Sequence, residues 1–235
     1  MTAIWTDEQW AELERAACSP CKVDIRHFNR GAKLPHGLNV GHVAAAMNEF
    51  IDFISYIGLQ LRAKNLSRLE SMLMPANLSS MVGEFIGAAI PRHCPTIVRN
   101  QYHNGHPDLI PAGMFPRDAV QYAQEGVEIK ASRYLKGWQG HNAEDAFLMV
   151  FCFDASRPVD RSKGIEPKPF RFLMATAAKL EKSDWTFAGR SETSRRTITA
   201  AVNNSGYKKM MSNWIYKASD LSQRQIDLVI RDEDA

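Results

Sequence analysis

No stretch of this sequence is apolar for long enough to cross a membrane. A helix that spans a bilayer needs about 20 consecutive apolar residues, and the 235-residue chain contains no run that approaches this length. The first ten residues include Asp7 and Glu8 and lack the basic and apolar pattern of a secretion signal. These absences predict a cytoplasmic protein that does not associate with membranes.

Cysteine is scarce as well. The four cysteines are too few and too unevenly spaced for a disulfide scaffold, so we expect reduced thiols. Cys18 and Cys21 have the spacing of half a zinc site, but no second pair of ligands with zinc spacing follows them. We therefore prefer two thiols at a helix end and keep a structural zinc site as the alternative.

Internal repeats and low-complexity segments are also absent. Hydrophobic residues make up 45% of the chain and charged residues 23%, which is typical of globular domains and excludes a disordered chain, a collagen-like fibre or a coiled-coil rod. A chain of this length can bury a core of its own, and no shift in composition marks a domain boundary. We expect one domain over residues 1–235.

The net charge of +3 conceals an uneven distribution. Residues 1–156 carry 14 basic and 16 acidic side chains, residues 157–217 carry 13 and 5, and residues 218–235 carry 2 and 5. The basic segment indicates a polyanionic partner, although a solvated basic face would explain it equally well.

Apolar residues recur at helical spacing in the N-terminal part of the chain. The pattern predicts helices over residues 6–18 and 42–61, then a short helix that Pro75 ends, and another from Asn77 or Ser79 to Pro91.

Short extended segments replace this pattern from about residue 96. The strands that we expect are 96–99, 108–110, 126–132, 147–153, 170–177 and 213–216. The continuous apolar run 147–153 is typical of a central strand that is covered on both faces. A helix over 193–202 and a turn at Gly206 complete the prediction. Together these elements indicate an α/β or α+β fold, in which helices flank a central mixed sheet and the N-terminal part is helical.

Three charged residues of this region form a candidate polar site. Asp108 lies in a short predicted strand, and 20 positions later Glu128 and Lys130 occupy alternate positions of another strand. Side chains alternate between the two faces of a strand, so Glu128 and Lys130 share one face while Ile129 points to the other. If the strand of Asp108 is adjacent, two carboxylates and an ammonium converge.

This combination suits hydrolysis of a phosphodiester bond. Two carboxylates can hold Mg²⁺, which lowers the pKa of a bound water and neutralises charge on the phosphate. Lys130 could hydrogen-bond the attacking water and the phosphate, or act as a base if burial lowered its pKa. His103 and His106 lie just upstream and are interpreted as hydrogen-bonding residues of a turn, outside the catalytic set.

At these positions the chain resembles the PD-(D/E)xK nuclease superfamily, because Pro107 and Asp108 match the first half of the motif and Glu128-Ile129-Lys130 the second. The resemblance implies a restriction-endonuclease-like core, Mg²⁺ held by Asp108 and Glu128, and Lys130 acting at the nucleophile. Family members often add an acidic residue from the preceding helix, and Glu84 occupies that place. Among the branches of the superfamily, a chain of this size without another module is most similar to type II restriction endonucleases, which implies cleavage of double-stranded DNA at a short specific site.

An enzyme of this kind needs residues that contact DNA. Arg pairs with guanine, Asn and Gln with adenine, Ser with base or phosphate, and Lys mostly with phosphate. The candidates are Arg190, Ser194, Arg195, Arg196, Asn203, Asn204, Lys208, Lys209, Gln139 and Asn142. For each of them a polar helix or turn at the surface is the alternative explanation. A homodimer is expected because a two-fold protein matches a palindromic site, with helix 42–61 as a candidate interface.

This interpretation divides the single domain into a mainly helical part (1–94), a catalytic sheet core (95–155), a basic DNA-recognition part (156–217) and an acidic tail (218–235). Two alternatives remain. The same core is also expected in a repair or recombination nuclease that cuts according to DNA structure. The other alternative is a DNA-binding module without catalysis, in which Asp108, Glu128 and Lys130 form only a group of ion pairs.

Overall fold

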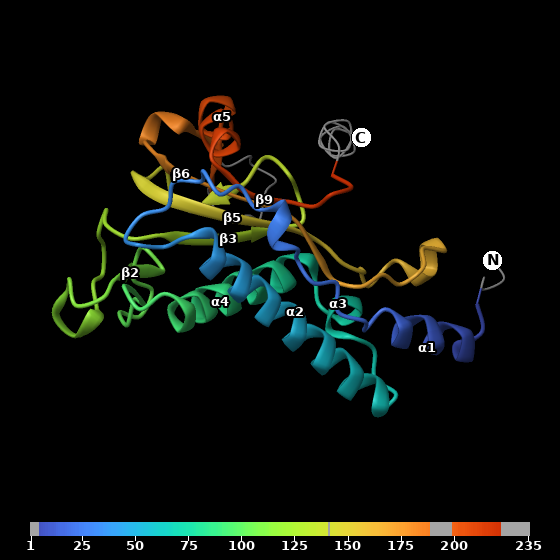
Figure 1. Ribbon diagram of the computed structural model, residues 1–235. Helices are drawn as coiled ribbons and strands as arrows, with labels where there is room; N and C mark the ends of the chain where they lie inside the picture. The colour runs from blue at the N-terminus through green and yellow to red at the C-terminus, as the bar shows by residue number, and fades with distance from the viewer. Residues whose placement is uncertain (1–4, 141, 189–198, 222–235) are drawn as a thin grey trace.

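The computed structural model describes residues 5–140, 142–188 and 199–221 and has a mixed α/β architecture (Figure 1). The helices are α1 (Asp7–Ala16), α2 (Val40–Ala63), α3 (Leu69–Met72), α4 (Pro75–His93) and α5 (Asn204–Ser212). The strands are β1 (Ile97–Arg99), β2 (Leu109–Pro111), β3 (Glu128–Ser132), β4 (Gln139–Gly140), β5 (Ala146–Asp154), β6 (Arg171–Leu180), β7 (Trp185–Ala188), β8 (Thr199–Val202) and β9 (Trp214–Lys217). Short 3₁₀ turns are η1 (Ile25–His27), η2 (Pro116–Asp118), η3 (Arg161–Lys163) and η4 (Lys182–Asp184).

The central sheet is mixed and has the strand order β3-β5-β6-β9. β3 runs parallel to β5, whereas the β5-β6 and β6-β9 pairs are antiparallel. The helices α2 and α4 lie on one face of this sheet and α5 on the other (Figure 1), which confirms the expected mixed sheet with flanking helices. β6 and β9 come from the segment assigned above to DNA recognition, so that segment also forms half of the central sheet.

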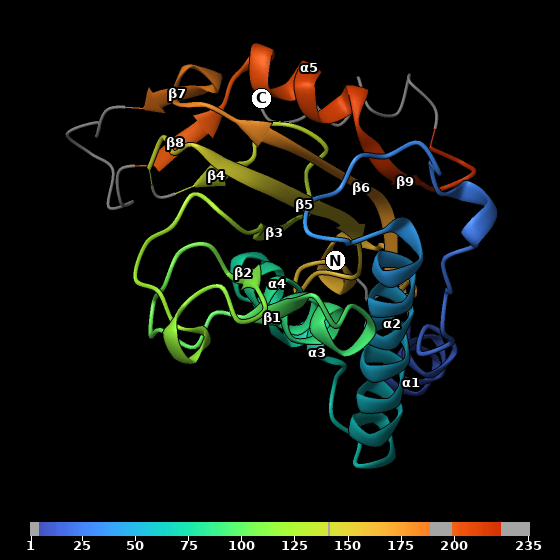
Figure 2. The ribbon, with the colours of Figure 1, turned by 60° about the vertical axis from the view of Figure 1, so that its left-hand side comes forward.

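Two smaller sheets lie beside the central one. β1 and β2 form an antiparallel pair, and the other sheet has the order β4-β8-β7. Figure 2 shows β1 and β2 near α4, and β7 and β8 near α5. The predicted strands correspond to β1, β2, β3, β5, β6 and β9, whereas β4, β7 and β8 were not predicted.

β5 is buried on both faces, as predicted. Phe151 and Phe153 belong to the core that the sheet shares with α2 and α4. Val150 and Cys152 belong to the core beneath α5. Successive side chains of a strand point to opposite faces, and each face of β5 meets a helical layer, so its sequence is apolar throughout.

The first two predicted helices are confirmed. Thr6 caps α1 in a capping box, in which its side chain accepts from the backbone of Gln9 and the Gln9 side chain accepts from the backbone of Thr6. Asn39 caps α2 by accepting from the backbone of Gly41, so this helix begins two residues earlier than expected. Among the helices of the described residues, none combines the length and the apolar character needed to span a membrane.

The helix expected from Asn77 or Ser79 to Pro91 is present as α4, but both of its ends differ from the prediction. Pro75 follows the short helix α3, as expected, and is also the first residue of α4, because a first-turn N–H has no partner within the helix and its loss costs little. Pro91 does not stop α4, since the helix continues to His93. Pro91 therefore sits in the last turn, where only a short piece of helix follows it.

We expected a helix over residues 193–202. Residues 193–198 lie outside the part of the chain that the structure describes, and over residues 199–202 the prediction is wrong. Thr199–Val202 forms β8, which pairs with β4 and β7. The helix, α5, comes later and contains Gly206, where we expected a turn. Asn203 caps α5 by accepting from the backbone of Ser205 and Gly206. Pairing with two neighbouring strands outweighs the local helical pattern, and an Asn cap starts the helix after it.

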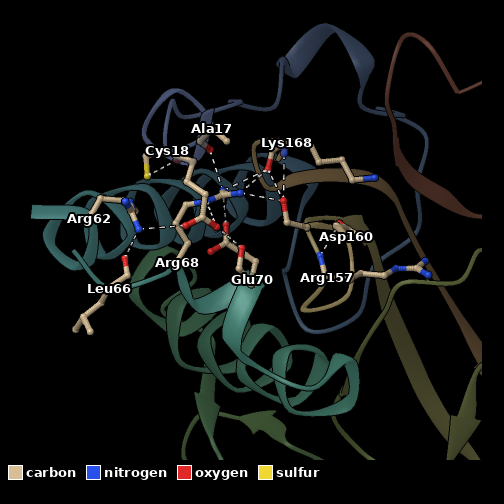
Figure 3. Close-up of polar contacts among 12 residues, drawn as sticks. Ala17, Cys18, Arg62, Leu66, Arg68, Glu70, Arg157, Asp160 and Lys168 are labelled. Carbon is tan, nitrogen blue, oxygen red and sulfur yellow. Dashed lines mark hydrogen bonds and ion pairs between the residues drawn. The ribbon is translucent and has the colours of Figure 1, made fainter. Parts of the chain in front are cut away.

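A network of buried charges joins α1, α3 and the loop after β5 (Figure 3). Arg68 is 1% exposed, and its Nη1 donates to Glu70 Oε1 at 3.1 Å and its Nη2 to Ser156 Oγ at 2.9 Å. Glu14 is fully buried and lies 3.3 Å from Nη1 of Arg62. Removal of charges from water is costly unless they are paired, so these pairs fix how the N-terminal helices meet the sheet.

Candidate active site

Two backbone hydrogen bonds bring the halves of the motif together. Leu109 N–H donates to Val127 O at 3.0 Å, and Val127 N–H donates to Leu109 O at 2.8 Å. Asp108 directly precedes Leu109, and Glu128 directly follows Val127. Asp108 Oδ2 also accepts from the backbone N–H of Ile129 at 2.8 Å. The expected convergence of Asp108 with Glu128 and Lys130 is therefore present in the structure.

Gly126 permits this close approach. Its φ is +137°, and a Cβ at this position would lie 2.2 Å from Leu109 O and 2.5 Å from the Pro107 side chain. No side chain fits there without separating the two segments that carry Asp108 and Glu128.

We therefore expect Gly126→Ala to destabilise the protein by roughly 1–3 kcal/mol and to impair the site. Gly113→Ala is the matched control, because Gly113 also has positive φ (+72°) but a Cβ there would meet nothing within 4 Å. Urea unfolding and a cleavage assay on both variants test this. Equal effects of the two substitutions would mean that close approach at Gly126 is unimportant.

Asp108, Glu128, Lys130 and Glu84 all line one cleft of about 510 Å³. One wall is the face of α4 that carries small residues, and the opposite wall is β3 with the segment before β2. The other lining residues are Ser79, Ser80, Gly83, Gly87, Arg99, Asn104, Gly105, His106, Ile129 and Ala131. The four residues predicted for catalysis come from distant parts of the sequence and line the same cleft.

The two carboxylates of the cleft differ in their ionisation. Burial opposes ionisation of Glu128, but a hydrogen bond from His106 and the charge of Lys130 outweigh it and lower the pKa of Glu128 to about 2. Burial and the negative charge of Glu128 raise the pKa of Asp108 to about 7, despite the hydrogen bond from Ile129. Each negative charge therefore raises the free-energy cost of ionising the other carboxyl group. A cation that binds both would relieve their repulsion.

The donor set fits Mg²⁺. Within the described residues, no group of three or more His, Cys, Asp or Glu side chains is arranged to hold a metal ion. Mg²⁺, however, is usually held by one or two carboxylates and completes its shell with water and substrate phosphate. Asp108 and Glu128 line the same cleft and could supply two hard oxygen ligands.

Lys130 is placed to act as an ammonium. Its Nζ contacts Oε1 of Glu128. Burial by itself would lower the pKa of Lys130, but Glu128 and Asp108 outweigh burial and raise it above the usual lysine value. Lys130 is therefore protonated near neutral pH, which favours hydrogen bonding to water and phosphate over action as a base.

Glu84 reaches the cleft from α4, but it is 67% exposed and contacts Arg99 of β1. Arg99 was not predicted from the sequence, because no motif marks it. The predicted catalytic set also lacked His106, whose Nδ1 lies 3.1 Å from Glu128 Oε2, and Glu144, whose Oε2 lies 2.9 Å from His106 Nε2. The position of His106, two residues before Asp108, was the available signal.

The predicted DNA contacts fall into three groups. Arg190, Ser194, Arg195 and Arg196 lie outside the described residues. Gln139 and Asn142 are exposed near the cleft, and Asn142 lines a small cavity together with His106, Glu128 and Lys130. The remaining four candidates belong to α5 and its cap, on the opposite face of the central sheet from α4 (Figure 1): Asn203, Asn204, Lys208 and Lys209.

Two of these last four have structural partners. The side-chain amide of Asn203 donates to Ser183 O at 2.8 Å, in addition to its capping bonds. Lys209 Nζ lies 2.6 Å from the buried carboxylate of Asp184. Asn204 and Lys208 are exposed.

Cys18 and Cys21 lie in different environments. Cys18 is buried and its Sγ donates to Glu14 O, whereas Cys21 is exposed. Burial raises the pKa of the Cys18 thiol.

Comparison with models of protein families, with curated proteins and with solved structures gave no match to this chain.

Proposed function

We propose that the protein is a Mg²⁺-dependent nuclease with a PD-(D/E)xK site on a restriction-endonuclease-like core. The observation that carries the proposal is the shared cleft, in which Asp108 and Glu128 lie side by side and Lys130 contacts Glu128. A group of surface ion pairs would not need a cleft of this size, nor a partly buried aspartate with a raised pKa.

Asp108 and Glu128 would hold the metal ion, which supplies Lewis acidity and a bound water of lowered pKa when present. The Lys130 ammonium would hydrogen-bond the attacking water and stabilise the negative charge that develops on the phosphate. Arg99 adds a second cation to the lining of the cleft, where it would bind a neighbouring phosphate after release from Glu84. These roles require only residues that line the cleft.

We further propose that the substrate is double-stranded DNA and that the enzyme is a cytoplasmic type II restriction endonuclease that acts as a homodimer. The excess of basic over acidic residues in 157–217 supports a polyanionic substrate. The second candidate is a repair or recombination nuclease with the same site, since the chemistry of the cleft does not depend on sequence recognition.

Digestion of sequenced, unmethylated phage DNA with and without Mg²⁺ tests the proposal. Discrete fragments that require Mg²⁺ would support a site-specific enzyme, and the fragment ends would give its site. A smear, or cleavage of branched junctions of random sequence, would favour the repair nuclease. Salt-sensitive binding without cleavage of any DNA would overturn the nuclease proposal in favour of a binding module.

The substrate path can be tested at Gly87, a cleft residue within α4. A Cβ at Gly87 would meet nothing within 4 Å, so larger side chains project into the open cleft. Gly87→Ala should leave cleavage unchanged and stabilise α4 by up to about 1 kcal/mol. Gly87→Phe should fold normally but raise the KM for DNA at least about tenfold. Equal KM values for the two variants would mean that the substrate does not pass along α4.

A further inference from the structure

His106 lies between two carboxylates at the edge of the cleft. Its Nδ1 is 3.1 Å from Oε2 of Glu128, and its Nε2 is 2.9 Å from Oε2 of Glu144. The three side chains come from separate segments, namely the one before β2, the start of β3 and the one before β5. All three are largely buried, with 19%, 14% and 22% of the side chains of His106, Glu128 and Glu144 exposed.

The imidazole ring is held in place by more than these contacts. It stacks on Tyr122, with ring centroids 5.5 Å apart and planes inclined by 17°. The backbone of His106 is fixed on the same segment, because its N–H donates to Gln121 O at 3.0 Å and its O accepts from Ala123 N–H at 2.9 Å. The ring therefore presents Nδ1 to Glu128 in one orientation.

Both oxygens of Glu128 are consequently oriented by neighbours. Lys130 contacts Oε1, and His106 contacts Oε2. A glutamate side chain otherwise loses considerable rotamer freedom when it is fixed. A carboxylate that is already oriented loses less of that freedom when it takes up a metal ion, and outer partners of this kind orient metal ligands in many proteins.

We propose that His106 and Glu144 are positioning residues, which orient the Glu128 carboxylate for a divalent cation. The inference rests on the proposed function, because Glu128 is a metal ligand only within that proposal. Carboxylate oxygens only accept hydrogen bonds, so His106 must donate to Glu128. The contact with Glu144 is an ion pair at 2.9 Å without an aligned hydrogen bond, so Glu144 acts by its charge and should contribute less than His106.

The test is the binding of Mn²⁺ to the full-length protein without DNA, measured by electron paramagnetic resonance of the free ion. We expect His106→Ala to weaken Mn²⁺ binding by roughly 10- to 100-fold. His106→Asn should restore part of this loss, because its amide N–H can replace Nδ1–H. Glu144→Gln should weaken binding by less than His106→Ala does. His103→Ala is the matched control, since His103 is exposed and is not among the residues that line the cleft.

Cleavage assays on the same proteins separate this inference from the proposed function. Wild-type Mn²⁺ affinity in both His106 variants, together with normal cleavage, would overturn the inference and leave the nuclease intact. Mn²⁺ binding that depends on Asp108 and on His106, without cleavage of any DNA, would support the inference and overturn the nuclease. Should His106→Ala fail to fold, Glu144→Gln tests the inference instead: weaker Mn²⁺ binding supports it, and wild-type binding by this folded variant contradicts it.

Discussion

Asp108→Asn should reduce DNA cleavage by about 10³-fold or more while the protein still folds and binds DNA. The asparagine keeps the shape of the side chain and can still accept from the backbone N–H of Ile129, which Asp108 does at 2.8 Å. It removes the negative charge that would hold the metal ion, and with it the charge stabilisation of the transition state. Initial rates on one DNA fragment, with DNA binding measured in Ca²⁺, test this expectation.

The same substitution should stabilise the metal-free protein above pH 7, by roughly 2–4 kcal/mol. Burial and Glu128 raise the pKa of Asp108 to about 7, whereas an unfolded chain has an aspartate pKa near about 3.9. Ionisation of Asp108 therefore costs the folded state free energy. The contribution of Asp108 to stability is most favourable below about pH 4, becomes less favourable as the pH rises to about 7, and then levels off. The advantage of the variant should grow over that same range.

Urea unfolding in EDTA at pH 4, 6 and 8 measures this effect. Asp118→Asn is a suitable control, because Asp118 does not line the cleft and lies in η2. Cleavage that survives Asp108→Asn would contradict the assignment of the metal ligand. A stability difference that does not change with pH would contradict the stated cause, namely the cost of ionising Asp108 in its partly buried position beside Glu128.

Arg68→Met should destabilise the protein by about 3–5 kcal/mol, the largest loss of stability that we expect from one side chain. Arg68 is the more deeply buried of the two cations of the network (Figure 3), and its guanidinium donates to Ala17 O, Glu70, Ser156 Oγ and Lys168 O. Methionine fills a similar volume but leaves Glu70 without its cation and these acceptors without a donor. An uncompensated buried charge costs far more than an exposed ion pair contributes.

Thermal and urea unfolding test this prediction, with a decrease in Tm of roughly 10 °C expected for a chain of this size. Arg68→Lys should lie between wild type and Arg68→Met, since it keeps the charge but loses the planar fork of donors. Arg26→Ala is the control, because Arg26 pairs with Asp24 at the surface and is 83% exposed on its side chain. A small effect of Arg68→Met would show that the network is not important for stability.

The helices and the central strand could be predicted because their signals are local. Thr6 and Gln9 form the capping box of α1 within four residues, and the apolar residues of β5 are adjacent in the sequence. The errors at the start of α4, at Pro91 and in β8 have a common cause. Proline is tolerated in the first turn and was not disruptive near the end of α4, and β8 is a strand because β4 and β7 pair with it.

The sequence by itself determined which residues of the site share a face. Glu128 and Lys130 alternate with Ile129 on one strand, and this periodicity requires no knowledge of the fold. Only the tertiary structure decided that Asp108 lies beside them, because Leu109 and Val127 bond across a long loop and Gly126 leaves room for that contact. Only the tertiary structure likewise shows that His106, Glu144 and Arg99 lie at the site. Their roles follow from distances between chain segments that lie far apart in sequence, and local periodicity carries no information about such distances.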